Sequence, residues 1–399
     1  MILSLLVTLL LGVISGTLTG LTPGIHINLI GAILISASIT FLAGIPPTIL
    51  LVFIISMAIT HTFLDFIPSI YFGAPDEDTG LSTLPGHFLL MRGEGQKAVT
   101  LTLIGSVIAI FSLSMILPAF IFIIPPIYPF IQKMMGFFLI WISIFLISHN
   151  KEKRLLSFSI FILAGFLGIA SLNLNLSQPL FPLLTGLFGT STIIYSIKSK
   201  GIIPEQILEK FQIPKKDLIK PALATIFISP ISALFPGLGS SQAAIIGSTI
   251  IKNLSREQFL ILIGSINTLI MSSSFIILLV LEKTRTGAAN TIIQLIPLDQ
   301  INIATIMVII ILTGIISIPL TLQISKYFAK RIDKINYILI SYIILSFLII
   351  LIIYFTKFPG LIILIASTIL GLACMELGIR RGLLMGSLLI PTIIYYLPF

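Results

Sequence analysis

Two proline–glycine pairs interrupt strongly apolar stretches of the 399-residue chain: Pro23-Gly24 in GTLTGLTPGIHINLIGA and Pro236-Gly237 in SPISALFPGLGSSQAAIIG. Because proline removes a backbone donor and clashes with the preceding turn, and glycine relaxes the backbone beside it, each pair predicts a break in a helix. A half-helix that begins after such a break presents unpaired N–H groups, which favour an anion. The two pairs therefore predict an anion-binding site between two broken helices.

Polar side chains follow both breaks and would add hydrogen-bond donors to this site. Hydroxyl, imidazole and amide groups donate to carboxylate or phosphate oxygens, and glycine allows close approach of the backbone. The predicted substrate-binding residues are Pro23, Gly24, His26, Asn28, Pro236, Gly237, Gly239, Ser240, Ser241 and Gln242. The alternative interpretation, that both prolines are ordinary helix kinks, stays open at this point.

Asp65 follows 64 residues that contain no Asp, Glu, Lys or Arg, and His61 precedes it by about one helical turn. An acidic side chain at the centre of a transmembrane helix costs roughly 2.5–3.5 kcal/mol or more, so it usually marks function. The spacing places both groups on one helix face, which predicts a proton relay or a cation-coupling site. The alternatives are that Asp65 lies near a helix end, or that it is protonated and caps a neighbour.

Three more polar residues are candidates for the coupling ion. Asp78 and Thr79 stand in the loop GAPDEDTG, where three adjacent acids repel one another and would attract a cation, unless Asp78 simply caps a short helix. Asn267 stands in an otherwise apolar segment. The predicted ion-coupling residues are Asp65, Asp78, Thr79 and Asn267. No metal-ligand cluster is predicted, and the single cysteine, Cys374, excludes a disulfide framework.

The composition places these residues in a membrane. Hydrophobic residues make up 57% of the chain and charged residues 9%, and the mean hydropathy is +1.16. A soluble domain carries about 25% charged residues, and a bilayer crossing needs roughly 20 apolar ones. Apolar runs of that length fill nearly the whole chain. The sequence therefore predicts an all-α, multi-pass protein of the cell membrane, with about ten transmembrane helices and two re-entrant helical hairpins.

The positive charges indicate the orientation. Thirteen of the 23 Lys and Arg residues fall in segments 149–154, 198–220 and 326–334. The positive-inside rule predicts that all three segments are cytoplasmic, which explains the net charge of +9 without a nucleic-acid partner. The proline-rich segment 124–129 predicts a hairpin between two crossings, and Lys357 is expected at an outer turn.

The two breaks also indicate an internal repeat. An offset of 213 residues superposes the two Pro-Gly pairs and aligns small residues: Gly12, Gly16, Gly20 and Gly24 with Thr225, Ser229, Ala233 and Gly237. We interpret Gly12, Gly16 and Gly20 as helix-packing positions. About five crossings separate equivalent elements, so the second copy is inverted, which is typical of secondary transporters. The predicted organisation is a first repeat at 1–198, a cytoplasmic linker at 199–220 and a second repeat at 221–399.

These motifs resemble the large permease subunit of tripartite tricarboxylate transporters, the TctA-type family. The resemblance rests on the two Pro-Gly segments, on PSIYFGAPDEDTGLSTLPGHFLLMRGEGQKAV (68–99) and on KTRTGAANTI (283–292). It implies a short, divergent member that moves small carboxylates, possibly tricarboxylates, with a sodium or proton gradient. It also implies a small membrane subunit and an extracytoplasmic binding protein as partners, besides membrane lipids.

Three functions fit the residues. The first is a secondary carboxylate transporter working by alternating access; no Walker-type phosphate loop is present, and no cofactor is expected. The second is a translocase for a lipid-linked phosphate. The third is an intramembrane hydrolase that uses His26, His61, Asp65 or His87, but neither HExxH nor Gly-x-Ser-x-Gly occurs, so no catalytic residue is predicted.

Overall fold

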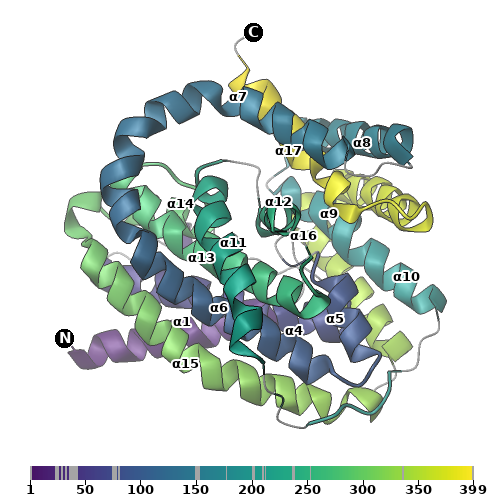
Figure 1. Ribbon diagram of the computed structural model, residues 1–399, viewed down its shortest axis with the longest axis horizontal. Coiled ribbons are helices and arrows are strands. Elements are labelled where there is room, and N and C mark those ends of the chain that lie inside the picture. Colours follow the sequence, from purple (N-terminus) through teal and green to yellow (C-terminus); the bar gives the residue numbers. More distant parts are fainter. Residues whose placement is uncertain are drawn as a thin grey trace.

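The computed structural model describes most of the chain. The residues outside its description are 1, 23–26, 28–29, 32–33, 36–43, 74–78, 80, 149–152, 177, 200–202, 209–210, 212, 236–238, 252, 335–336 and 398–399. Every regular element among the described residues is a helix, which confirms the predicted all-α class (Figure 1).

The helices follow one another with short connections. In the first half they are α1 (Ile2–Leu21), α3 (Pro47–Leu64), α4 (Phe66–Tyr71), α5 (Thr83–Leu90), α6 (Gly95–Pro118), η1 (Ala119–Ile123), α7 (Ile124–Ser148), α8 (Arg154–Asn173), α9 (Leu180–Leu184), η3 (Thr185–Thr190) and α10 (Ser191–Ser199). In the second half they are α11 (Lys215–Leu234), α12 (Ser240–Ile250), α13 (Arg256–Leu281), α14 (Gly287–Leu295), η4 (Leu298–Gln300), α15 (Ile303–Ala329), η5 (Ile332–Lys334), α16 (Tyr337–Glu376), η6 (Arg381–Met385) and α17 (Gly386–Tyr396).

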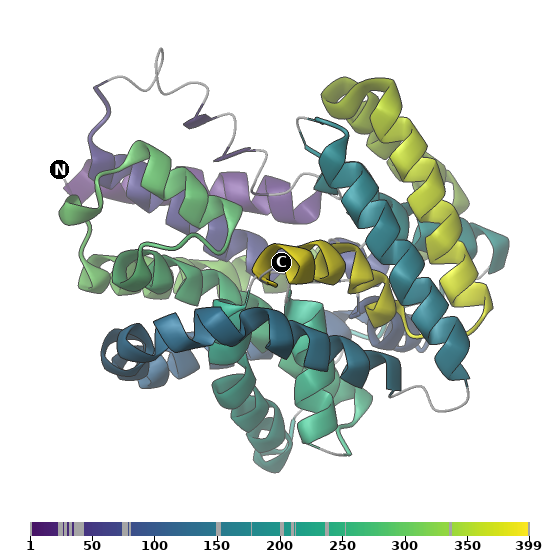
Figure 2. The ribbon, with the colours of Figure 1, turned by 90° about the horizontal axis from the view of Figure 1, so that it is seen from above.

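Eight helical segments of the described chain are long and apolar enough to cross a membrane. Two of them, Gly95–Ser148 with 54 residues and Ser341–Glu376 with 36, have the length of two crossings each. The second is divided at Lys357, whose left-handed φ of 55° interrupts α16, and Figure 2 shows the chain reversing there. Counted by their arms, these segments agree with the prediction of about ten crossings. The protein is a multi-pass membrane protein.

The expected hairpin at residues 124–129 differs in the structure. The chain stays helical from α6 through the π-helix η1 into α7, and Figure 1 shows this ribbon bending in a wide arc around the outside of the molecule. Pro125 and Pro126 occupy the first turn of α7, where proline is best tolerated, and the π-helical turn before them absorbs the lost hydrogen bonds. The prolines therefore bend the helix and do not end it.

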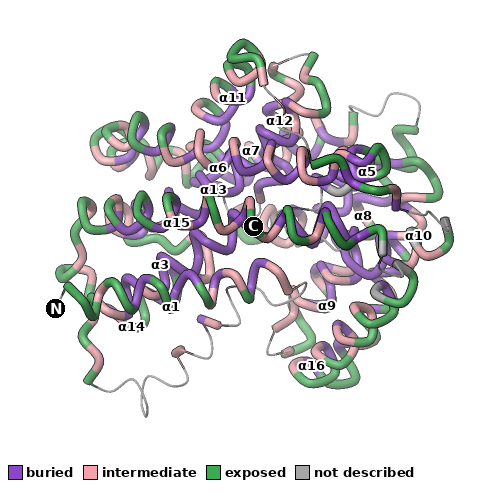
Figure 3. The backbone as a smooth tube through the Cα atoms, turned by 90° about the horizontal axis from the view of Figure 1, so that it is seen from below, coloured by how far each residue is buried: buried purple, intermediate pink, exposed green. Residues whose placement is uncertain are grey.

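The centre of the molecule is formed by α3 and α13. From Leu50 to Leu64 only Phe53 of α3 is not fully buried, and α13 is buried from Leu260 to Leu278, whereas the surrounding helices expose their outer faces (Figure 3). Helix α1 packs closely on α3, because a side chain at Gly12 would collide with Ser56 and one at Gly16 with the Met57 carbonyl. The predicted packing role of these glycines is confirmed.

The helix bounds and pairings of the two halves correspond. Helices α1 and α11 differ by 213 residues at both ends. Helix α1 packs on α3 as α11 packs on α13, and α3 packs on α15 as α13 packs on α6. An inverted repeat predicts these same pairings. The repeat and its boundaries at 198 and 220 stay a prediction.

Contacts gather the three basic segments near one end of the bundle. Lys153 donates to the Leu377 carbonyl, and Lys198 lies 3.0 Å from the carboxylate of the adjacent Glu376. In segment 198–220, the Ile207 N–H donates to the Gly93 carbonyl at 2.7 Å. In segment 326–334, the ring of Phe328 packs on those of Tyr71 and Phe72 near the start of α6. This arrangement is the one that the positive-inside rule requires.

Candidate functional site

Asp65 lies at a break within the buried central span. It separates α3 from α4, and its side chain is 3% exposed. The break has a local cause, because Pro68 has no N–H to donate to the carbonyl of Leu64 one turn earlier. The sequence thus places a carboxylate at a helix interruption inside the membrane-spanning segment Pro47–Tyr71.

A chain of hydrogen bonds connects Asp65 to the second half of the protein. The Nδ2 of Asn267, on α13, donates to the Oδ2 of Asp65 at 2.7 Å. The Oγ of Ser240, the first residue of α12, donates to the Oδ1 of Asn267 at 3.2 Å. Two predicted ion-coupling residues and one predicted substrate-binding residue therefore meet directly. We call Asp65, Asn267 and Ser240 the central chain.

Hydroxyl groups surround the central chain. Thr268 donates to Thr62 at 3.1 Å and to Ser106 at 2.9 Å, so that α13, α3 and α6 share one small network. Ser317 of α15 donates to Thr60 at 3.2 Å. Since hydroxyl, amide and carboxylate oxygens are ligands for hard cations and protons, this centre can bind a cation. Among the described residues no group of three His, Cys, Asp or Glu side chains gathers as a metal site.

The first turn of α12 carries the other described residues of the predicted substrate site. Gly239 is extended at the N-cap, with φ −73° and ψ 178°, and Ser240, Ser241 and Gln242 are buried. The amide Nε2 and Oε1 of Gln242 have no hydrogen-bond partner among the described residues. Because a buried amide is costly unless it is hydrogen-bonded, Gln242 has the free donor and acceptor expected of a group that holds a polar solute.

The other predicted site residues are placed as follows. Pro23, Gly24, His26, Asn28, Pro236, Gly237 and Asp78 lie outside the described residues. The carbonyl of Thr79 accepts from the hydroxyl of Ser82 at 2.7 Å and from that of Ser69 at 3.3 Å. The Nδ1 of His61 lies 3.0 Å from the Oγ1 of Thr19 on α1, while Asp65 contacts Asn267.

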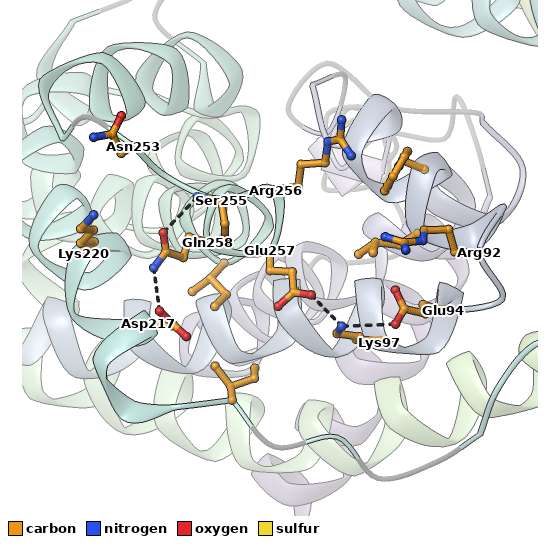
Figure 4. Close-up of a pocket in the computed structure, with 14 residues that line it drawn as sticks. Arg92, Glu94, Lys97, Asp217, Lys220, Asn253, Ser255, Arg256, Glu257 and Gln258 are labelled. Atoms are coloured by element: carbon orange, nitrogen blue, oxygen red, sulfur yellow. Dashed lines mark hydrogen bonds and ion pairs between the residues drawn. The ribbon is translucent and has the colours of Figure 1, made fainter.

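The structure also contains a polar cavity that the sequence did not indicate, close to the basic segments. Its volume is about 900 Å³ (Figure 4). Lys97 lies 2.6 Å from the carboxylate of Glu257 and 3.4 Å from that of Glu94. Gln258 donates to Asp217 at 3.1 Å. Each acid on this cavity wall therefore has a cationic or amide partner.

Phe88 separates this cavity from a neighbouring one. The Cζ of Arg256 lies 3.9 Å from the centre of the Phe88 ring, and that of Arg92 lies 5.3 Å from it. Ser255 and Gln258 form a capping box that begins α13 and positions Arg256 at the cavity rim. That capping box is a local signal visible in the sequence, but its position beside α5 depends on tertiary packing.

A buried helix pair from two halves of the chain, joined through a carboxylate and an amide, defines a class of polytopic helical protein with a polar centre in the membrane. The comparison with known families identifies it further. The model of the tripartite tricarboxylate transporter TctA family matches residues 6–386, and the chain belongs to this family. The resemblance read from the sequence is confirmed, and the protein is a transporter subunit.

A similar protein has been described only as uncharacterized. It is the uncharacterized protein MJ1079 of Methanocaldococcus jannaschii, 30% identical over 406 residues that cover 98% of this chain and 99% of the relative. No solved structure matches the chain.

Proposed function

We propose that the protein is a secondary transporter of small carboxylates, possibly tricarboxylates, that uses a cation gradient and alternating access. The central chain carries this proposal. It joins the N-terminal turn of α12, which suits an anion, to a buried carboxylate, which suits a sodium ion or a proton. Asn267 lies between the two and would transmit the state of one site to the other.

The same contact suits alternating access. Asp65 comes from α3 and Asn267 from α13, so their hydrogen bond connects the two proposed repeats. A rocking motion of one repeat against the other would break and re-form this bond. Cation binding at Asp65 would compete with the amide of Asn267, and the competition would couple the cation to the movement.

Two partner subunits follow from the family. We propose that a small membrane subunit completes the complex and that an extracytoplasmic protein delivers the solute. The basic segments would face the cytoplasm, and the cavity of Figure 4 would open there. A cysteine at Lys330 is then expected to react with an impermeant reagent only from inside, and one at Lys357 only from outside.

The test of function is uptake into proteoliposomes with imposed sodium or proton gradients. A panel of radiolabelled mono-, di- and tricarboxylates is offered, with a polyprenyl phosphate as the competing substrate class. Gradient-driven uptake of a carboxylate is expected, and it should lose its gradient dependence in Asp65→Asn. The matched control is Asp299→Asn, an exposed aspartate far along the chain, which should keep it. Translocation of the lipid phosphate alone would overturn the carboxylate proposal.

A further inference from the structure

A second cavity adjoins the one in Figure 4 and differs from it in charge. Its volume is about 780 Å³, and it shares Phe88, Asn253, Ser255 and Arg256 with its neighbour. Its other walls come from the C-terminal half of α12 and from the start of η6, where Arg380 and Arg381 stand side by side. We call it the arginine cavity.

The arginine cavity has cationic groups without acidic ones. Three arginines line it, Arg256, Arg380 and Arg381, and no Asp or Glu occurs among its described lining residues. The ion pairs between described residues involve none of these arginines. Ser248, Thr249 and Asn253 add hydroxyl and amide groups to the wall. An arginine fork with neighbouring hydroxyls matches the oxygens of phosphate and carboxylate groups.

Arg381 adds a buried charge to this wall. Its side chain is 4% exposed, and its Nη2 donates to the carbonyls of Phe188 at 2.7 Å and Leu187 at 3.3 Å. Its Nε and Nη1 have no hydrogen-bond partner among the described residues. A buried guanidinium is costly unless charge or hydrogen bonds compensate it, and two carbonyls use only part of its five donors. A negative charge in the adjoining cavity would supply the missing compensation.

The neighbouring cavity shows why the arginine cavity is the selective one. There, Lys97 is held by two glutamates, and Asp217 accepts from Gln258. An anion would meet its own kind of charge on that side. On the side of Arg380 and Arg381 it would meet only cations, hydroxyls and an amide, and Arg256 at the shared rim would favour entry.

We infer that the arginine cavity binds an oxyanion of two or more negative charges, a phosphate or polycarboxylate group, at the end of the bundle that carries the basic segments. This site is separate from the central chain, and it stands whether or not the protein moves carboxylates. Its walls are also apolar, through Leu81, Ile245 and Phe259, so the oxyanion can be a free solute or the headgroup of a phospholipid.

The test measures binding to the purified full-length protein. Inorganic phosphate and citrate are titrated at constant ionic strength against chloride, with the thermal unfolding midpoint as readout. A second arm reconstitutes the protein in nanodiscs with phosphatidic acid or with phosphatidylcholine only. A saturable rise of the midpoint with phosphate or citrate identifies a free anion, and a rise with phosphatidic acid alone identifies a headgroup.

The variants Arg256→Gln and Arg380→Gln are each expected to weaken this binding by about tenfold or more, because each removes a charge-assisted contact. Two variants exist so that a folding defect in one leaves the other informative. The control Arg154→Gln removes an exposed arginine outside the cavity and should keep wild-type binding. Ser240→Ala should also keep it, which separates this site from the central chain.

Two results would overturn the inference. The first is the absence of any saturable midpoint rise, in both arms, beyond the chloride and phosphatidylcholine references. The second is an equal weakening in Arg154→Gln and in the two cavity variants, which would indicate a general effect of positive charge.

Discussion

Asp65 and Arg381 are two buried charges that the protein accommodates in different ways. Their exposed fractions are nearly the same, 3% and 4%. Asp65 accepts a hydrogen bond from a side-chain amide on a helix of the other half of the chain, whereas Arg381 donates to two backbone carbonyls at the end of a π-helix. A side-chain partner on another helix can leave when helices move. Backbone carbonyls are fixed, so Arg381 is suited to a permanent wall and Asp65 to a changing contact.

The largest difference between the two charges is expected in stability. Arg381→Met removes the donor to the carbonyls of Leu187 and Phe188 and should lower the free energy of unfolding by about 3 kcal/mol. Asp65→Asn keeps an acceptor oxygen for Asn267 and removes a buried charge, so its loss should stay below about 1 kcal/mol. Unfolding in mixed detergent micelles measures both values.

The exposed Arg154→Met is the control for that comparison, since it makes the same substitution outside the buried wall. If Asp65→Asn destabilised the protein as much as Arg381→Met, the carboxylate would be a structural group, and its role as a changing contact would be excluded.

The next prediction concerns the partner of the carboxylate. Asn267→Ala removes the amide that donates to Asp65, which costs about 2 kcal/mol for a hydrogen bond to a charged group. The apparent affinity for the coupling cation should change by roughly 30-fold, while Asn173→Ala on the exposed end of α8 leaves it unchanged. The measurement is the cation dependence of uptake. A cation dependence that is the same in wild type and Asn267→Ala would remove Asn267 from the coupling site.

The sequence was sufficient to identify the buried carboxylate and the polar residue opposite it. Asp65 and Asn267 stand out because each interrupts a long apolar segment, and lipid makes such interruptions costly. Their meeting could not be predicted, because it joins residues 202 apart and depends on how α3 and α13 pack. The small residues that permit such close packing, Gly12 and Gly16 among them, were visible as a pattern, but not their partners.

Arg381 shows what the sequence could not indicate. It belongs to a pair of arginines that the positive-inside rule interprets as an exposed anchor, and Arg380 is indeed exposed. Arg381 instead turns inward, because η6 packs between α8 and α12 and directs it toward the carbonyls that follow α9. The wide bend between α6 and α7 was also missed, because proline patterns do not distinguish a tight hairpin from a bent helix.

The smallest effect is expected at the outer end of the central chain. Ser240→Ala removes a neutral hydrogen bond to Asn267, worth about 1 kcal/mol, while the charged bond between Asn267 and Asp65 stays intact. The half-saturating concentration of the carboxylate should rise about fivefold, with the cation dependence unchanged. Ser273→Ala is the matched control, because this buried serine of α13 bonds only to its own helix at the Ile270 carbonyl. A shift in cation dependence without a shift in carboxylate affinity would place Ser240 with the cation and move the substrate away from α12.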